Sequence, residues 1–363
     1  MLLSSALIAS GRIWIFSEAD ILIQIDSGDR HYRVEAETGE SILLALERAG
    51  YKMRRSCLNG VCQICNVELL AGSIIQRYPE LDVSLQDGHQ PARIYACTAV
   101  PQGDIRVKID GLLGPGEFRV KKLVCDIASV EQLSHEVFRV RLHLPVTASM
   151  AIEFHAGQYL ELILPDGRCA PFSIGSAPDH GSDLELHIRR MPEGELSIAI
   201  IEHLQNNPSI EVELPKGDCY LDASSLKPQT RIVLVAASTG FSQIKSITEH
   251  LLANQVSNPI RIYWGVRVAE DLYLEKLPQQ WAAEHANVSY ELVVSEPENG
   301  QAWEGRTGLI PDAILADCDD FSDTVIYTSG SPGMVYALLD ACEAQGFDGD
   351  CMHADVFAYA PRK

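Results

Sequence analysis

Three cysteines crowd into one short stretch of the chain, Cys57-Leu-Asn-Gly-Val-Cys62-Gln-Ile-Cys65. The spacing Cys-x4-Cys-x2-Cys, with a fourth cysteine at Cys97, is typical of a plant-type [2Fe–2S] cluster, because two irons require four thiolates. Zinc sites usually take their ligands from two paired sets instead. Gly60 lets the backbone wrap closely and turn its amides towards the sulfurs. The stretch predicts a [2Fe–2S] cluster bound by Cys57, Cys62, Cys65 and Cys97.

Short elements surround this cysteine loop on both sides. Alternating apolar residues over 21–25 and 31–34 predict a hairpin, and a helix is expected from Ser41 to Ala49, ended by Gly50. After the loop, a strand over 66–70 is expected to reach a turn at Ala71-Gly72. Further strands are expected over 94–97 and 105–109. The prediction is an α+β, β-grasp-like domain over residues 18–110.

After residue 110 the pattern of expected secondary structure changes twice along the chain. Glycines and a proline predict a linker over residues 111–118. Regularly spaced short strands and one helix then predict an antiparallel β-barrel over residues 119–225. Alternating strands and helices predict an α/β doubly wound sheet over residues 229–363. The expected barrel strands are 122–130, 137–144, 159–164, 172–174, 184–189 and 210–214, with the helix over 197–204. The expected strands of the last domain are 231–236, 260–263, 290–294 and 324–327, with a helix over 241–254.

Charge and cysteine content narrow the possible partners and compartment. The 363 residues carry a net charge of −21, and residues 1–110 contribute only −3 of it, with 14 acidic and 11 basic side chains. An acidic surface argues against nucleic acid and anionic membranes as partners. The apolar run Leu2–Ser10 is far too short to span a membrane. The six cysteines outside the ligand set show no ligand spacing and are expected to be reduced, which favours a cytoplasmic location.

From the cysteine loop to the last domain, over residues 20–360, the sequence resembles the ferredoxin-fused, flavin-dependent reductases. These serve bacterial multicomponent oxygenases and deoxysugar dehydrases. The C-terminal two thirds is also similar to stand-alone NAD(P)H:flavin reductases. The resemblance implies an oxidoreductase that passes electrons from NAD(P)H through FAD, rather than FMN, to the [2Fe–2S] cluster and on to a partner protein.

In the barrel, Ala170-Pro171-Phe172-Ser173 resembles the family's flavin motif, Arg-x-(Tyr/Phe)-Ser. The resemblance implies that Phe172 packs against the isoalloxazine and that Ser173 hydrogen-bonds near its N5. Ala170 replaces the arginine that pairs with a flavin phosphate in the family, so another cation is expected to substitute. The residues that the resemblance places on the flavin are Arg168, Pro171, Phe172, Ser173, His187, Arg189, Gly194 and Ser197.

In the last domain, Ala237-Ser238-Thr239-Gly240 follows a buried strand and opens a helix, which is typical of a phosphate-binding loop. Three further motifs resemble the family, and the implied nucleotide-binding residues are Thr239, Gly240, Arg267, Arg306, Gly330 and Pro332. Ser329 stands where relatives often carry a cysteine facing the nicotinamide, and Phe357 resembles the aromatic tail near the flavin. Residues Phe172, Ser173, Ser329 and Phe357 are therefore the expected catalytic set. Few cations follow Arg267, which favours NADH over NADPH.

Three basic residues, Lys52, Arg54 and Arg55, precede the cysteine loop and suggest a docking surface for an acidic partner. The sequence leaves the acceptor open among ring-hydroxylating oxygenases, monooxygenases and sugar dehydrases. Two alternative functions also stay open. One is a flavin reductase that releases reduced flavin, and the other is a redox-sensing iron–sulfur flavoprotein without a dedicated oxygenase.

Overall fold

The computed structural model describes residues 21–145, 153–181, 183–191, 194–221, 223, 226–299 and 302–362. The apolar run Leu2–Ser10 lies outside them. Contacts between residues divide the chain into two compact units, Met1–Arg119 and Val120–Lys363. Each unit is described by itself below. No helix among the described residues is long and apolar enough to cross a membrane.

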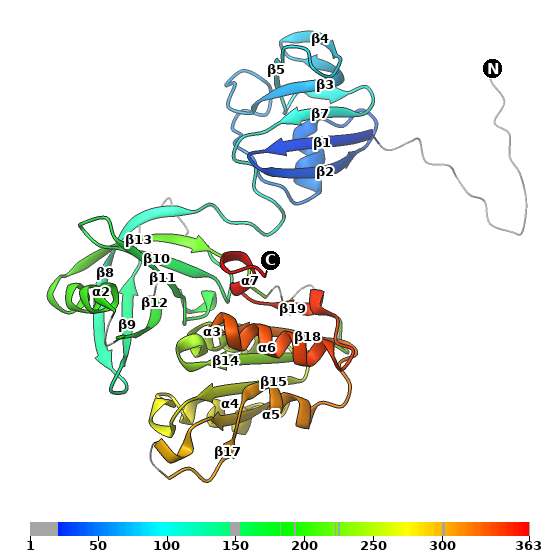
Figure 1. The fold of residues 1–363 in the computed structure, drawn as a ribbon. Coiled ribbons are helices and arrows are strands. Elements are labelled where there is room, and N and C mark those ends of the chain that lie inside the picture. The colour runs from blue at the N-terminus through cyan, green and yellow to red at the C-terminus, as the bar shows by residue number, and fades with distance from the viewer. Residues whose placement is uncertain are drawn as a thin grey trace, which may run out of the picture. The chain divides into compact units, whose positions relative to one another are not determined.

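The first unit is a seven-stranded sheet with one helix packed on it, the expected β-grasp-like fold (Figure 1). Four side chains of the helix are buried against the sheet, and Ser41 caps its first turn by accepting a hydrogen bond from the Leu44 amide. Strands β1 and β7 pair in parallel and the other pairs are antiparallel. The elements are β1 (Ile21–Ser27), β2 (Arg30–Ala36), α1 (Ile42–Arg48), β3 (Asn66–Arg77), β4 (Glu80–Leu85), β5 (Ala92–Tyr95), β6 (Ala99–Pro101) and β7 (Ile105–Lys108).

The expected turn at Ala71-Gly72 is wrong, because β3 continues through it to Arg77. The register of β3 against β7 shifts between Leu69 and Ala71, so the glycine marks a bulge and not the end of a strand. Gly72 has a φ of +94°, and a β-carbon there would collide with the backbone of Asp104. A glycine is required at this position by both the backbone angle and the close approach.

The second unit begins with the near-closed antiparallel barrel that the strand spacing predicts (Figure 1). Its strand order is β11-β10-β13-β8-β9-β12, and a bridge between Ile174 and Leu186 links the two ends of that order. Helix α2 buries Ile200, Ile201 and Leu204 in the barrel core. The elements are β8 (Lys121–Gln132), β9 (Val137–His143), β10 (Tyr159–Ile163), β11 (Cys169–Ser173), β12 (Asp183–Arg189), α2 (Glu195–Asn206) and β13 (Ser209–Lys216).

The same unit continues into a parallel sheet of six strands in the order β17-β16-β15-β14-β18-β19. The strand order reverses between β14 and β18, which is where open α/β sheets bind ligands. Residues of β14 and helix α3 share a hydrophobic cluster with Ala156, Cys219 and Leu221 of the barrel region, so the two layers share one core. The elements are β14 (Arg231–Ala237), α3 (Phe241–Ala253), β15 (Ile260–Val266), α4 (Lys276–Glu284), β16 (Val288–Val294), β17 (Arg306–Thr307), α5 (Ile310–Asp317), β18 (Thr324–Ser329), α6 (Pro332–Glu343), β19 (Met352–His353) and α7 (Val356–Tyr359).

Candidate active site

The four predicted cluster cysteines gather between α1 and β3 and at the end of β5, and they lie in two pairs. The sulfurs of Cys65 and Cys97 are 3.1 Å apart, and the Cys62 amide donates to the Cys57 sulfur over 3.3 Å. Within the described residues, no three histidine, cysteine, aspartate or glutamate side chains converge on a point that could hold a single ion. Two pairs of thiols suit two irons that each take two thiolates.

The backbone of the cysteine loop adopts three left-handed residues in close succession. Leu58, Gly60 and Gln63 have φ of 61°, 83° and 58°. These angles turn loop amides towards Cys57, and hydrogen bonds from the amides of Cys62 and Asn59 help to lower the pKa of its thiol to about 6. Left-handed non-glycine residues store strain that the surrounding structure must support. The loop is therefore pre-shaped to present thiolates and N–H groups to a metal–sulfur group.

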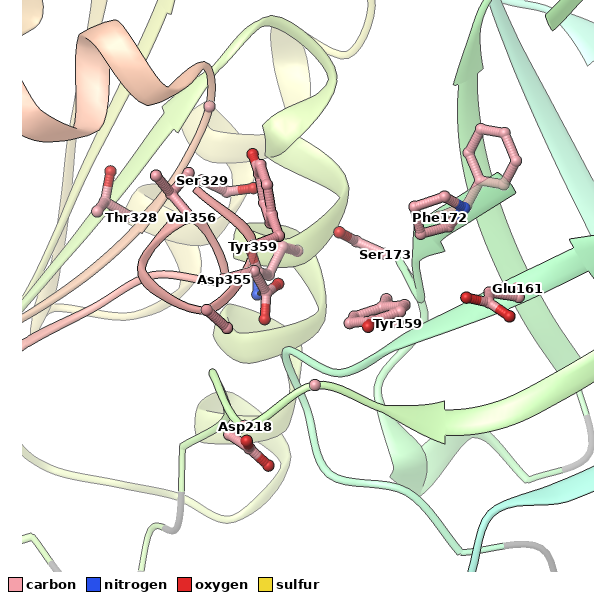
Figure 2. Close-up of a pocket in the computed structure, with 15 residues that line it drawn as sticks. Tyr159, Glu161, Phe172, Ser173, Asp218, Thr328, Ser329, Asp355, Val356 and Tyr359 are labelled. Carbon is pink, nitrogen blue, oxygen red and sulfur yellow. Dashed lines mark hydrogen bonds between the residues drawn. The ribbon is translucent and has the colours of Figure 1, made fainter. Parts of the chain in front are cut away.

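A cavity of about 580 Å³ lies in the second unit where the barrel meets the parallel sheet (Figure 2). The predicted Pro171, Phe172 and Ser173 line it from β11, and Ser329 and Gly330 line it from the end of β18. Figure 2 shows Ser173 on one side of the cavity and Ser329 on the facing side. The structure thus brings together the barrel residues predicted to bind flavin and the residues predicted to face a nicotinamide.

Two side chains of the C-terminal segment that are not among the predicted site residues also line this cavity. Asp355 lines it, and burial raises the pKa of its carboxyl group to about 6 although the amide of Gln243 donates to it over 3.0 Å. Tyr359 also lines it, with 65% of its surface exposed. The sequence signal that could have found them is their position, two residues on either side of Phe357. A carboxyl group that titrates near neutral pH beside a cavity can hold or release a proton.

The predicted Phe357 does not line the cavity. Its ring packs against Tyr336 of α6 at 5.6 Å between centroids, inside a small hydrophobic cluster. Arg168 also lies outside the lining, since it stands in the β10–β11 turn and pairs with Asp166 at 2.8 Å. Phe357 packs within this cluster and Arg168 is held by a neighbouring carboxylate, so neither side chain lines the cavity.

The three remaining flavin candidates with polar side chains already have partners within the barrel unit. Ser197 accepts from the Met191 amide over 3.0 Å and donates to the carbonyl of Gly194 over 2.9 Å. Arg189 pairs with Glu136 at 2.6 Å and lines a second cavity instead of the first. His187 has a fully buried side chain and does not line the first cavity. In the structure, Ser197 braces the N-terminus of α2 and His187 belongs to a buried network.

The His187 ring bridges two groups at the boundary between barrel and sheet. Its Nε2 lies 2.9 Å from Glu185 and its Nδ1 lies 3.0 Å from the Tyr273 hydroxyl. Burial lowers the pKa of His187, so the ring is neutral and donates Nε2–H to the carboxylate. Burial by itself would raise the pKa of Glu185, but the hydrogen bond from His187 and the charge of Lys245 outweigh it and lower the pKa to about 2.

This carboxylate predicts how the stability of the second unit depends on pH. The pKa of Glu185 falls from 4.5 to about 2 on folding, so its stabilising contribution is complete above pH 4.5 and is lost as the pH falls through 2. At 1.36 kcal/mol per pKa unit the contribution is about 3 kcal/mol. We expect Glu185→Gln to lower the free energy of unfolding by about that amount at pH 7, and by much less near pH 2. Urea denaturation at both pH values measures it, and a pH-independent difference would contradict it.

The second cavity, of about 470 Å³, lies at the carboxyl edge of the parallel strands. Ala237 and Ser238 of the predicted phosphate loop line it, together with Arg267 and Ser331. Ser238 has a φ of +51°, which lies in the left-handed region that favours glycine. A β-carbon on Gly240 would collide with the carbonyl of Ser329, so the loop lies directly against the end of β18.

Of the other residues predicted to bind the nucleotide, Arg267 lines this cavity and the rest lie outside its lining. The guanidinium of Arg267 makes two 2.9 Å contacts with Glu296. Arg306 lies outside the lining and pairs with Asp317 at 2.6 Å. Pro332 begins α6, directly after the capping residue Ser331, and Thr239 lies in the single turn before α3. The two cavities follow one another along Ser329–Ser331, which is the arrangement needed for a nucleotide to reach a group held by the barrel.

Two pairs of thiols on a β-grasp domain, and a barrel and a parallel sheet that share adjoining cavities, define an iron–sulfur flavoprotein reductase. Family comparisons agree for each part. Residues 25–102 match the 2Fe-2S iron-sulfur cluster binding domain, residues 124–220 the oxidoreductase FAD-binding domain, and residues 234–339 the oxidoreductase NAD-binding domain.

Similar proteins cover nearly the whole chain. Protein RfbI of Salmonella typhimurium is 34% identical over 322 residues, 88% of this chain and 91% of its own. Reductase component 1 of terephthalate 1,2-dioxygenase from Comamonas is 29% identical and covers 93% of this chain and 98% of its own. The crystal structure of the Amycolatopsis cytochrome P450 reductase GcoB is 26% identical, with a TM-score of 0.61 over 91% of this chain and 97% of that one. The chain belongs to the family of ferredoxin-fused, FAD- and NAD(P)H-dependent reductases.

Proposed function

We propose that the protein takes hydride equivalents from NADH and delivers single electrons through its [2Fe–2S] cluster to a partner protein. The observation that supports this best is the cavity lined on one side by Phe172 and Ser173 and on the other by Ser329 and Gly330. A hydride donor and its acceptor must meet in van der Waals contact, and this cavity provides one place for both. When bound, FAD supplies the conversion between a two-electron donor and a one-electron cluster.

The residues of the cavity would orient the reactants and manage protons. The hydroxyls of Ser173 and Ser329 are available on opposite walls as hydrogen-bond donors (Figure 2). Asp355 can hold a proton because burial raises its pKa to about 6. Tyr359, an exposed aromatic side chain at the rim, can cover whatever stacks in the cavity and exclude water.

The proposed preference for NADH is supported by the charges around the second cavity. The 2′-phosphate that distinguishes NADPH requires a free cation. Arg267 lines the cavity but its guanidinium is held in two hydrogen bonds by Glu296. Comparing kcat/KM for the two nucleotides tests the preference.

One visible absorption spectrum tests the whole proposal. The purified protein should show both flavin and cluster absorbance, and anaerobic NADH should bleach both. Bleaching of the flavin bands with an unchanged cluster would contradict the electron path. Absence of any bleaching would contradict the function itself.

A flavin reductase that releases its product is the second candidate, and one observation favours it. Among the described residues that line the first cavity there is no arginine or lysine, whereas Glu161, Asp218 and Asp355 all line it. A flavin phosphate near these groups would lack a partner cation. Flavin that stays bound in stoichiometric amount through desalting would exclude this alternative.

The partner is proposed to be an oxygenase or dehydrase component that docks near the cluster. Of the three basic residues before the loop, Lys52 lies over the Phe118 ring at 5.3 Å and Arg55 pairs with Glu47 at 2.5 Å. Arg54 is exposed, and it forms no ion pair with the described residues. Leu58, Val61 and Ile64 of the cysteine loop expose 51%, 61% and 46% of their surfaces. A partner with an apolar centre and an acidic rim would match this surface.

Charge reversal at Arg54 tests the docking surface with a basic acceptor, cytochrome c. Because cytochrome c is cationic, we expect Arg54→Glu to raise kcat/KM for NADH-driven cytochrome c reduction about threefold at low salt, and the gain to vanish at high salt. Arg33→Glu is the matched control, an exposed arginine on the edge strand β2. Equal effects of the two variants would contradict docking at Arg54.

A cytoplasmic location is also a proposal. It is supported by the six cysteines outside the ligand set, which the structure describes as free thiols.

A further inference from the structure

One face of helix α3 is attached to the end of the barrel strand that carries Ser173. The Ser242 hydroxyl donates to the carbonyl of Ser173 over 3.0 Å, and the Lys245 ammonium donates to the carbonyl of Gly175 over 3.1 Å. The Ser246 hydroxyl donates to the next carbonyl, that of Ser176, over 2.8 Å. These donors stand at positions i, i+3 and i+4 of the helix and so share one face. Helix α3 begins immediately after the phosphate loop, so the attachment joins that loop to the flavin strand.

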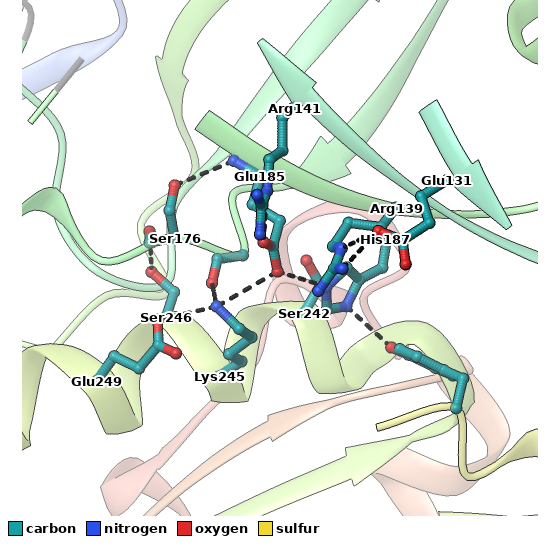
Figure 3. Close-up of polar contacts among 12 residues, drawn as sticks. Glu131, Arg139, Arg141, Ser176, Glu185, His187, Ser242, Lys245, Ser246 and Glu249 are labelled. Atoms are coloured by element: carbon teal, nitrogen blue, oxygen red, sulfur yellow. Dashed lines mark hydrogen bonds and ion pairs between the residues drawn. The ribbon is translucent and has the colours of Figure 1, made fainter. Parts of the chain in front are cut away.

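Lys245 is the one charged donor among the three, and it is buried. Only 7% of its surface is exposed, and its ammonium lies 3.3 Å from Glu185 and 2.9 Å from Glu249. Glu185 also accepts from His187 and lies 3.5 Å from Arg141 (Figure 3). A buried ammonium with two carboxylates and a carbonyl has a single favourable position, because leaving any of these groups unpaired is costly. Lys245 therefore fixes the helix against the barrel more strictly than apolar packing would.

A second set of contacts leads from the same cluster back to the phosphate loop. His187 hydrogen-bonds to Tyr273, and the Tyr273 ring packs edge-on against Trp264 with centroids 5.1 Å apart. The Trp264 indole N–H donates to the carbonyl of Ser238 over 3.0 Å. The buried cluster thus contacts the flavin strand directly and the phosphate loop through two aromatic rings.

We propose that Lys245 is a positioning residue for hydride transfer, which holds the nucleotide-binding loop in register with the flavin strand through Glu185 and the carbonyl of Gly175. The inference rests on the proposed function, in which Ser173 lies at the flavin and Ala237–Gly240 at the nucleotide. Lys245 touches neither group, and it acts through the backbone that carries each. Its loss leaves both binding sites intact but places the two reactants imperfectly relative to one another.

Replacement of the ammonium by a methyl thioether tests this in the full-length holoprotein. We expect Lys245→Met to slow flavin reduction at saturating NADH by about tenfold to a hundredfold, since a misplacement of about 1 Å has effects of that size. The KM for NADH and the flavin content should stay at wild-type values, and the long-wavelength charge-transfer absorbance of the flavin–nicotinamide complex should fall. Lys245→Arg, which keeps the charge and the donors, should restore part of the rate.

Hydrogen–deuterium exchange supplies a readout that does not depend on turnover. In Lys245→Met the amides of residues 173–176 and of residues 237–240 should exchange faster together, while those of the first unit stay unchanged. Lys122→Met is the matched control, because Lys122 pairs with Glu211 at 2.7 Å on the same barrel but is 54% exposed. It should leave the reduction rate and both segments unchanged.

The outcomes separate this inference from the proposed function. A wild-type protein that NADH does not reduce overturns the function, whereas normal reduction of Lys245→Met overturns the positioning role of Lys245. If Lys245→Met fails to fold, Ser246→Ala decides, because it removes only one neutral hydrogen bond of the same attachment. A reduction rate lowered about threefold at unchanged KM supports the proposal, and an unchanged rate overturns it.

Discussion

Gly60→Ala is expected to lose most of the [2Fe–2S] cluster while the flavin remains reducible by NADH. Gly60 has a φ of +83°, and a β-carbon there would collide with the carbonyl of Tyr78. The strained φ costs about 1–3 kcal/mol, and 1.4 kcal/mol corresponds to a factor of ten in an equilibrium. Because the loop that carries Cys57, Cys62 and Cys65 must move away from Tyr78, NADH-driven cytochrome c reduction should fall at least about tenfold. Ferricyanide, which accepts electrons from flavin directly, should be reduced at the wild-type rate.

Substitution of a second glycine, Gly88, distinguishes the effect of backbone strain from the effect of moving the cluster ligands. Gly88 has nearly the same angle, a φ of +86°, but a β-carbon there would meet nothing within 4 Å. Gly88→Ala should therefore destabilise the first unit through its backbone angle and keep its cluster. Visible absorbance and iron content measure both variants. A Gly60→Ala protein with full iron content would show that the loop tolerates the movement, and the prediction would then be wrong.

The element types could be predicted because each domain has its own hydrophobic period. Segments of the barrel in which apolar and polar residues alternate are strands in the structure. Continuous apolar runs in the last domain are also strands. Strand β4 was missed because all of its residues are exposed or half-buried, so no apolar alternation marks it. Gly72 suggested a turn because glycine also serves at bulges, and sequence alone does not distinguish the two.

The candidate site was predictable where its residues are neighbours in one strand, as Phe172 and Ser173 are. The C-terminal segment shows why the rest was not. In an extended segment Asp355, Phe357 and Tyr359 would share one face. The structure instead forms the helical turn α7, which brings positions four apart, Asp355 and Tyr359, to the cavity and turns Phe357 towards Tyr336.

The roles of the remaining residues depend on which side chains they contact in the folded chain, and the sequence does not show those contacts. Arg168 is expected from the resemblance to lie on the flavin, but it precedes β11 and is held by Asp166. His187 lies 86 positions from its partner Tyr273 in the sequence, and no local sequence pattern predicts that contact. The resemblance implied a role for His187, whereas Lys245 was not among the predicted residues. Only the fold shows what these two side chains contact.

Gly240→Ala is expected to slow flavin reduction by NADH about a hundredfold, the effect of a displacement of about 1 Å at a reacting pair. The backbone of Gly240 is in the ordinary helical region, so its angle suits any residue. The constraint is contact, because a β-carbon would collide with the carbonyl of Ser329. That carbonyl belongs to β18, which pairs with β14 along its length, so the phosphate loop must move and not the strand. Stopped-flow absorbance under anaerobic conditions measures the rate, and NAD⁺ titration measures affinity.

Gly349→Ala is the matched control for this variant. Its β-carbon would also collide with an oxygen, but that oxygen is the end of the exposed Glu343 side chain, which can rotate away. The two variants therefore compare a collision with rigid backbone and a collision with a flexible side chain in the same domain. Gly349→Ala should therefore keep the wild-type rate and affinity, whereas Gly240→Ala should lose both. Equal rates in the two variants would show that the loop can leave β18 without consequence, and the nucleotide would then have to bind elsewhere than at Ala237–Gly240.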